Sequence, residues 1–217
     1  MMVKKAIFID HKKVESRKYY HFIKRVFDVI LSATGLIILS PIMGIIAYKI
    51  KKEDGGPIIY KQLRVGRNGQ KFEMYKFRSM VPNADRLLKQ LSAQNDIDGA
   101  MFKMKNDPRI TQIGHFIRKH SLDELPQLVN VLKGNMSLVG PRPPLPSEVD
   151  KYTDYDRQRL YVKPGCTGLW QATERNSVGF NEMVKIDLKY IQRANLGLDF
   201  YIICKTINII FKPNESY

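Results

Sequence analysis

Cysteine is scarce in this chain: Cys166 and Cys204 are the two thiols among 217 residues. They stand 38 residues apart in the sequence and form no C-x-x-C pair. So sparse a set argues against a disulfide framework and against a metal cluster, and it favours a reducing compartment. We expect two unpaired structural thiols.

Acidic residues are also few, 21 against 36 basic ones, which leaves a net charge of +15. Such a field attracts anions, of which nucleic acid, acidic lipid headgroups and phosphorylated substrates are the main classes. The sequence has no zinc finger, helix-turn-helix or aromatic RNA-binding strand, so nucleic acid is not an expected partner. No cleavable signal peptide is apparent, because the first 21 residues are polar and basic.

One long apolar run is present, over residues 26–50, interrupted near its ends by Asp28 and Lys49. As a helix it would rise about 1.5 Å per residue, enough to cross a hydrocarbon core of about 30 Å. Two features oppose a straight crossing. Pro41, preceded by Ser40, predicts a kink in the middle. Both flanks are also strongly basic, which the positive-inside rule disfavours for opposite faces of a membrane.

We therefore expect a re-entrant membrane helix over residues 22–51 that breaks at Ser40 and Pro41 and returns to the cytoplasm. A single kinked transmembrane helix is the alternative. Residues 1–21 are a basic N-terminal segment, and residues 52–217 are expected to form one cytoplasmic catalytic domain with interfacial helices. The predicted fold class is α+β and helix-rich, with a small β-hairpin.

The hairpin is predicted over 57–77, with its turn at 66–69, because an Asn-Gly pair tolerates positive φ. A helix is expected from the acid pair of residues 123 and 124 to Lys133, where Gly134 ends it. Further helices are expected over 83–93, 111–119, 147–160, 180–193 and 196–211, with loops over 94–108 and 164–176.

The segment 121–142 carries two adjacent carboxylates, Asp123 and Glu124. Ser121 and Glu124 have the spacing of a capping box. That start would place Pro126 inside the helix, at a cost of about 3 kcal/mol. We therefore expect Asp123 to be the N-cap, which puts Pro126 among the residues whose N–H groups are free in any case. An ordinary N-cap is the structural interpretation of this pair.

A functional interpretation uses the same geometry. A helix N-terminus binds phosphate, and a carboxylate held there can attack phosphorus. A neighbouring carboxylate can help to hold Mg²⁺. Arg118 and Arg142 supply planar groups that match phosphate oxygens. Together with the membrane segment, these residues point to phosphoryl chemistry on a lipid-linked substrate.

Five ordered blocks resemble the bacterial initiating sugar transferases, which are monotopic polyprenyl-phosphate phosphoglycosyl transferases. The blocks are KRVFD at 24–28 with the Ser-Pro that follows, YKFRSM at 75–80, SLDELPQL at 121–128, KGNMSLVGPRP at 133–143 and KPGCTGLWQ at 163–171. The resemblance covers nearly the whole chain after residue 21. It implies a membrane element that is re-entrant and breaks at the Ser-Pro.

The resemblance also implies an activity. The family transfers a sugar-1-phosphate from a nucleotide sugar, usually a UDP-sugar, to undecaprenyl phosphate and releases the nucleoside monophosphate, here UMP. By resemblance Asp123 is the nucleophile of a Mg²⁺-dependent ping-pong reaction, and Glu124 assists the metal or the acid–base step. Both carboxylates are thus expected metal ligands. Lys76, Arg118 and Arg142 are implied phosphate contacts.

The implied location is the bacterial inner membrane, with the catalytic domain facing the cytoplasm, at the first membrane step of capsule, exopolysaccharide, O-antigen or glycoprotein glycan assembly. The expected partners are the UDP-sugar, undecaprenyl phosphate and membrane lipid, and a homodimer is left open. Relatives follow Gly-Leu-Trp-Gln with a small residue and Gly-Arg, whereas this chain has Glu174 before Arg175, so the sugar is undetermined. Larger relatives carry an extra N-terminal membrane bundle, and we expect this chain to be the catalytic unit alone. The alternative function is a non-catalytic membrane scaffold that recruits glycosyltransferases.

Overall fold

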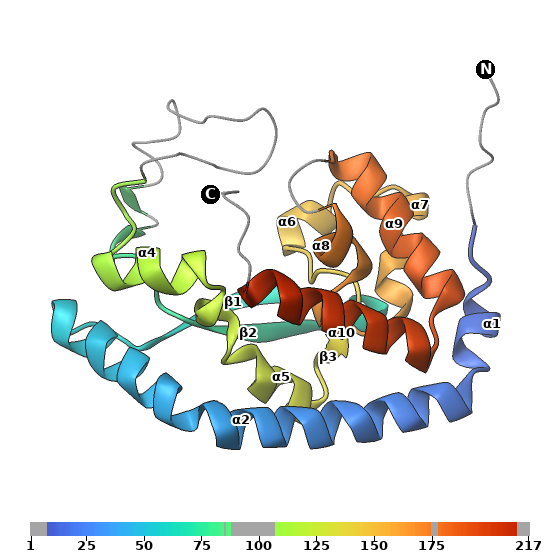
Figure 1. Cartoon of the computed structure of the whole chain (residues 1–217). Coiled ribbons are helices and arrows are strands. Elements are labelled where there is room, and N and C mark those ends of the chain that lie inside the picture. Colours follow the sequence, from blue (N-terminus) through green and yellow to red (C-terminus); the bar gives the residue numbers. More distant parts are fainter. Residues whose placement is uncertain (1–7, 85, 88–106, 175–177, 212–217) are drawn as a thin grey trace.

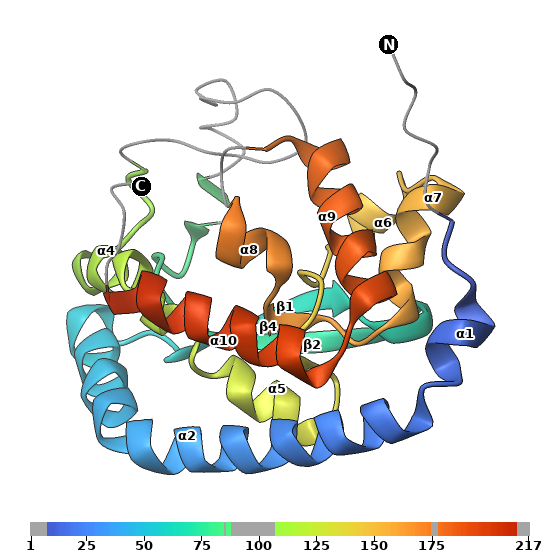
Figure 2. The same cartoon turned by 45° about the vertical axis from the view of Figure 1, so that its right-hand side comes forward.

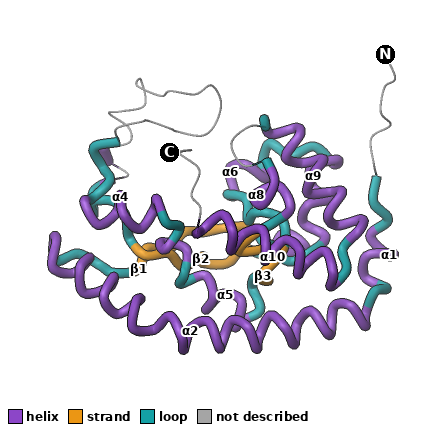
Figure 3. Tube along the Cα trace, in the orientation of Figure 1, coloured by secondary structure: helices purple, strands orange, loops and turns teal. Residues whose placement is uncertain are grey.

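In the computed structural model, residues 8–84, 86–87, 107–174 and 178–211 are described. The helix-rich α+β class is confirmed, since helices surround two small sheets of two strands each (Figures 1 and 3). The strands are β1 (Ile59–Val65), β2 (Lys71–Phe77), β3 (Ser137–Val139) and β4 (Gly165–Thr167). The helices are α1 (His11–Glu15), α2 (Lys18–Asp54), α4 (Gln112–Lys119), α5 (Gln127–Lys133), α6 (Pro146–Val149), α7 (Asp154–Arg157), α8 (Leu169–Thr173), α9 (Phe180–Arg193) and α10 (Leu196–Phe211).

The long helix α2 lies along one side of the body and curves towards α4 (Figures 1 and 2). It extends beyond the expected range 22–51 at both ends. Within the described ranges, it is the one helix long and apolar enough to cross a membrane, and 11% of its most apolar 18-residue window is buried in the body. Phe27, Ile37 and Tyr48 are among its exposed side chains. The helix therefore offers an apolar face that the rest of the chain does not cover.

The helix α2 continues through Ser40 and Pro41, so the expected break is not an interruption of the helix. Proline has no N–H to donate to the carbonyl of Ile37, four residues earlier. Ser40 Oγ donates to that carbonyl instead, at 2.8 Å. A carbonyl left unsatisfied in an apolar setting would cost about 1–3 kcal/mol. The serine thus preserves the helix while the proline ring favours a bend.

Polar side chains fasten the first half of α2 to the body. Asp28 accepts a hydrogen bond from the Leu138 N–H of β3 at 2.9 Å. Lys24 pairs with Asp199 of α10 at 2.9 Å. Arg25 donates to two of the last carbonyls of α5, at 2.6 and 2.8 Å. The apolar helix is therefore joined to three elements of the body by charged side chains.

The predicted hairpin is confirmed. Strands β1 and β2 pair antiparallel, with Ile59 opposite Phe77 and Val65 opposite Lys71. The turn contains Asn68 with φ of 55° and Gly69 with φ of 80°, the conformation for which Asn-Gly is suited. The hairpin extends from the body near α4 to the vicinity of α1 (Figure 2).

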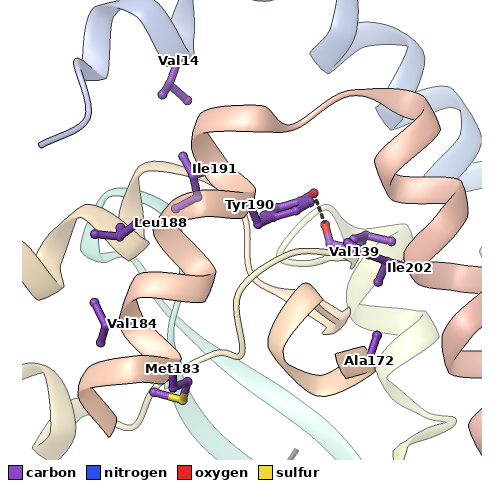
Figure 4. Close-up of a cluster of buried hydrophobic side chains, with 9 residues drawn as sticks. All are labelled: Val14, Val139, Ala172, Met183, Val184, Leu188, Tyr190, Ile191 and Ile202. Carbon is purple, nitrogen blue, oxygen red and sulfur yellow. Dashed lines mark hydrogen bonds between the residues drawn. The ribbon is translucent and has the colours of Figure 1, made fainter. Parts of the chain in front are cut away.

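The main hydrophobic core lies between α9, α10 and β3. Val184, Leu188 and Ile191 follow the helical spacing of one buried face of α9. Tyr190 points from α9 towards β3 and donates its hydroxyl to the Val139 carbonyl at 3.3 Å (Figure 4). The core therefore fixes β3, the strand that leads into the Gly-Pro-Arg turn.

Two sequence expectations outside the acid pair are wrong. The helix expected over 147–160 is divided into α6, α7 and a 3₁₀ turn (Gln158–Tyr161), because Thr153 starts a new helix by accepting from the Asp156 N–H. The loop expected over 164–176 contains β4, which pairs parallel with β3, and α8. The helices expected over 111–119, 180–193 and 196–211 are confirmed. The helix expected over 83–93 and the loop over 94–108 lie largely outside the described residues.

Candidate active site

The acid pair lies in a 3₁₀ turn (Leu122–Glu124) between α4 and α5. The expectation that Asp123 caps a helix is wrong, since α5 begins at Gln127 with Pro126 in the N-cap position. Pro126 has no N–H for the Asp123 carbonyl, so the 3₁₀ hydrogen-bond pattern cannot continue through it. Ser121 turns the chain just before the pair, with a left-handed φ of 56°. The charge of the pair must therefore be balanced by side chains rather than by a helix N-terminus.

Lys76 of β2 supplies one positive charge to the pair. Its Nζ lies 2.6 Å from Glu124 Oε1 and 3.7 Å from Asp123 Oδ2. The Asp123 side chain is 13% exposed and that of Glu124 is 38% exposed. Lys76 of the hairpin thus interacts with two carboxylates, of which Asp123 is the more buried. The structure brings together three of the residues that the sequence singled out.

The electrostatics differ between these groups. Burial raises the pKa of the Asp123 carboxyl above its ordinary value, Lys76 and Arg118 oppose this rise, and Glu124 adds to it. Burial lowers the pKa of Lys76, but Glu124 and Asp123 outweigh that effect, so its pKa is raised. Lys76 therefore remains a cation throughout the physiological pH range.

Two further arginines act on the acid pair from different elements. Arg118, in the last turn of α4, lowers the pKa of Asp123. The sequence did not single out Arg64 of β1. The one feature that could have indicated its role is that this charged residue stands between two apolar ones, Leu63 and Val65. Burial and the neighbouring charge of Arg142 together lower the pKa of Arg64 to about 10, and the charges of Glu148 and Glu124 oppose this fall.

The Gly-Pro-Arg turn is held by buried guanidinium groups. Prolines in the loop 140–144 lack N–H groups, so the loop can form few hydrogen bonds within itself. Arg159 Nη2 donates to the Arg142 carbonyl at 3.3 Å. Arg64 Nη1 donates to the Pro143 carbonyl at 2.8 Å. Two consecutive carbonyls are therefore fixed by arginines, and the charge of Arg142 acts on neighbouring Arg64.

Backbone contacts hold the flanking carbonyls of the same loop. Gly165 N–H donates to the Pro141 carbonyl at 2.9 Å, and Val65 N–H donates to the Pro144 carbonyl at 2.9 Å. The backbones approach so closely that a Cβ on Gly165 would lie 2.1 Å from the nitrogen of Gly140. Glycine is therefore required where β4 passes the loop.

The remaining predicted residues are placed as follows. Ser40 and Pro41 are exposed on α2. Glu174 is an exposed residue at the C-terminal end of α8, and Arg175 lies outside the described residues. Both cysteines are free, as expected. Burial raises the pKa of the Cys166 thiol above its ordinary range, which agrees with a structural role.

Sequence comparisons identify the family of the chain. The sequence profile of bacterial sugar transferases matches residues 19–213. This chain belongs to that family. The match includes the acid pair, Lys76 and the loop with Arg142, so the assembled site lies within the family domain.

Individual relatives extend the comparison. The chain is 48% identical over 206 residues to the undecaprenyl-phosphate galactose phosphotransferase of Salmonella typhimurium, covering 93% of this chain and 43% of that protein. It is 49% identical over 195 residues to the galactosyl transferase CpsE of Streptococcus agalactiae, covering 89% of this chain and 43% of that protein. It is 39% identical over 216 residues to the exopolysaccharide production protein ExoY of Sinorhizobium fredii, covering 98% and 96%. The chain thus spans under half the length of the first two relatives and nearly all of the third.

The support of the Arg142 loop gives a testable prediction. Arg159 and Asp187 form an ion pair at 2.8 Å, with each side chain 2% exposed. We expect Arg159→Met to lower the free energy of unfolding by about 3–5 kcal/mol, because it leaves Asp187 charged and buried. The double variant Arg159→Met/Asp187→Leu should recover most of that loss. Chemical unfolding of the full chain in detergent micelles measures both, and equal losses in the single and double variants would contradict the prediction.

Proposed function

We propose that this protein is a phosphoglycosyl transferase that moves a sugar-1-phosphate from a UDP-sugar to undecaprenyl phosphate and releases UMP. The observation that carries the proposal is the position of Lys76, whose Nζ lies within ion-pair distance of both Asp123 and Glu124. Membership of the bacterial sugar transferase family supports it. The name of the Salmonella relative supports the acceptor.

The reaction we propose has two displacement steps. Asp123 Oδ attacks the phosphorus that bears the sugar, an Asp O–P bond forms, and the P–O bond to UMP breaks, so that UMP leaves with the bridging oxygen. A phosphate oxygen of undecaprenyl phosphate then attacks the same phosphorus. The Asp O–P bond breaks, which regenerates the carboxylate and leaves a sugar diphosphate on the lipid.

The surrounding residues have distinct roles in this scheme. Lys76 lowers the pKa of Asp123, and so keeps the nucleophile ionised. Arg118 and Arg142 contact phosphate oxygens of the donor, because a guanidinium group binds them through two parallel hydrogen bonds. Arg64 holds the Arg142 loop and adds positive charge behind it. In this scheme these cations offset part of the charge that a diphosphate brings.

We propose Mg²⁺ as the cofactor, held by Asp123 and Glu124. Within the described residues, no group of three or more His, Cys, Asp or Glu side chains gathers. Two adjacent carboxylates suit Mg²⁺ in phosphoryl-transfer sites, where substrate phosphates complete the coordination. The bound ion would neutralise charge on the phosphate oxygens of the donor as UMP departs. The donor set of this chain therefore fits the ion together with its substrate.

Covalent labelling tests the nucleophile. With a radiolabelled UDP-sugar and Mg²⁺ but no acceptor, the wild-type chain should become labelled and release about one equivalent of UMP. Asp123→Asn should lower both by at least about a thousandfold, because the amide cannot attack phosphorus. Asp150→Asn, which changes an exposed aspartate at the end of α6, is the matched control. Labelling of Asp123→Asn at the control rate would contradict the mechanism, and no UMP from any donor would favour the scaffold. UDP-galactose is the first donor to test, because two relatives are named for galactose transfer.

The pH dependence of labelling tests the electrostatics. The reactive form of Asp123 is ionised, so labelling should fall as pH falls through the pKa of this carboxyl, which burial raises and Lys76 lowers. In Lys76→Gln the cation that lowers this pKa is absent, and the midpoint should move to higher pH. The midpoint, rather than the rate, is the measurement, with circular dichroism as the check that the fold persists. A midpoint that stays in place or moves to lower pH in Lys76→Gln would refute the assigned role.

We also propose that α2 is re-entrant in the bacterial inner membrane, with the catalytic domain in the cytoplasm. The support is that both ends of α2 bind the same body. Lys24 pairs with Asp199 near the start, and Arg78 Nη1 donates to Asp54 Oδ2 at 2.6 Å at the end. A straight crossing would separate these ends by about 30 Å of hydrocarbon. The apolar residues between them are mostly exposed, as a helix dipping into one leaflet requires.

Accessibility labelling tests this topology. Lys13→Cys and Lys52→Cys are exposed positions on either side of the membrane segment, and Lys185→Cys on α9 is a control on the body. In a Cys166→Ala/Cys204→Ser background, all three should react with an impermeant maleimide in inverted vesicles and none in intact cells. Reaction of Lys13→Cys alone in intact cells would indicate a true crossing.

A further inference from the structure

A hollow of about 420 Å³ lies between the hairpin turn and the C-terminal end of α5. Three of its lining residues are basic, namely Arg67, Lys71 and Lys163, and none is acidic. The others are glycines, amide side chains and Phe72. The hollow therefore combines positive charge with neutral hydrogen-bond donors.

This hollow is separate from the acid pair. Lys71 opens β2 and Lys76 lies five residues further along the same strand. At about 3.4 Å per residue, the two lysines are about 17 Å apart along the strand. Neither the nucleophile nor its partners line the hollow, so the mechanism proposed above leaves this group of cations unused.

The cations in and beside the hollow crowd one another. A Cβ on Gly134 would lie 3.5 Å from both Lys163 Nζ and Arg25 Nη2, so these two charges are within 7 Å of each other. Arg25 is occupied by neutral carbonyls of α5. Burial lowers the pKa of Lys163, the charges of Arg25 and Arg67 add to this fall, and the charge of Asp28 opposes it without reversing it. Within the described part of the chain, Lys163 has neither a hydrogen-bond nor an ion-pair partner.

Arg67 is only partly satisfied. Its Nη2 pairs with Glu15 of α1 at 3.0 Å, while its Nε is buried without a partner. Such unbalanced positive charge is unfavourable unless an anion compensates it. A phosphate group accepts charge-assisted hydrogen bonds from lysine and arginine together. We propose that this hollow is a second binding site, which takes a phosphate-bearing anion between Lys163, Lys71 and Arg67.

The surroundings permit two sources of that phosphate. Arg25 precedes Val26 and Phe27, whose exposed side chains belong to the apolar face of α2. If this face contacts lipid, as proposed above, a phospholipid headgroup would lie close to the hollow. A soluble phosphate or nucleotide is the other source. Both present the same group to the three cations.

Thermal unfolding of the full chain in uncharged detergent micelles tests the proposal. One arm adds sodium phosphate against sodium chloride of equal ionic strength, and the other adds short-chain phosphatidylglycerol against phosphatidylcholine. The background is Arg118→Gln/Arg142→Gln, so that the acid-pair site does not contribute. We expect a saturable rise in Tm in at least one arm, and a response to the lipid arm alone would identify a headgroup.

Variants then locate the site. Lys163→Gln and Lys71→Gln should each weaken binding and so raise the half-saturating concentration by about tenfold, which is the usual effect of losing one charged hydrogen bond. Lys163→Arg should retain the response, and Lys185→Gln on α9 is the matched control. Lys71 is exposed, so its variant decides the matter if Lys163→Gln does not fold. The absence of a rise in both arms, or an unchanged response in Lys71→Gln, would overturn the proposal.

Discussion

The attachment of both ends of α2 to one body is the constraint on which the rest of the structure depends. Lys24 and Asp199 hold one end, and Asp54 and Arg78 hold the other. An apolar helix tied in this way cannot extend away from the body without separating partly buried charges. The curvature of α2 follows from these fixed ends. In the proposed re-entrant topology, the same contacts would set the depth of the body relative to lipid, because α2 also supports α5.

A second constraint acts at the Gly-Pro-Arg turn, where prolines give rigidity but remove hydrogen-bond donors. Every carbonyl from residue 141 to 144 accepts a hydrogen bond from outside the loop. Arg64 and Arg159 supply two of these bonds, and Arg159 is itself fixed by Asp187. The chain thus uses buried arginines as structural donors that hold the loop carrying Arg142.

The sequence was sufficient for the features that rest on local chemistry. The Asn-Gly turn at Asn68 predicted the hairpin, and the helix expected over 180–193 has the bounds of α9. It was insufficient where distant segments decide the structure. The pairing of β3 with β4 joins residues about 28 positions apart, and the short strands carry no periodic signal of their own. Arg64 was missed for the same reason, since its partners come from the loop after β3.

Because α5 begins at Gln127 rather than at Asp123, the charge of the acid pair is not stabilised by a helix N-terminus. A helix N-terminus would have stabilised a charged Asp123 through free N–H groups, but Pro126 ends the 3₁₀ turn before the helix begins. Burial then raises the pKa of Asp123, and Lys76 is the largest opposing influence. A lysine shared with Glu124 can turn towards an arriving phosphate, whereas a helix dipole is fixed. The pKa of the Asp123 carboxyl is therefore coupled to the charges beside it, as the proposed role of this residue as a nucleophile on an anionic donor would require.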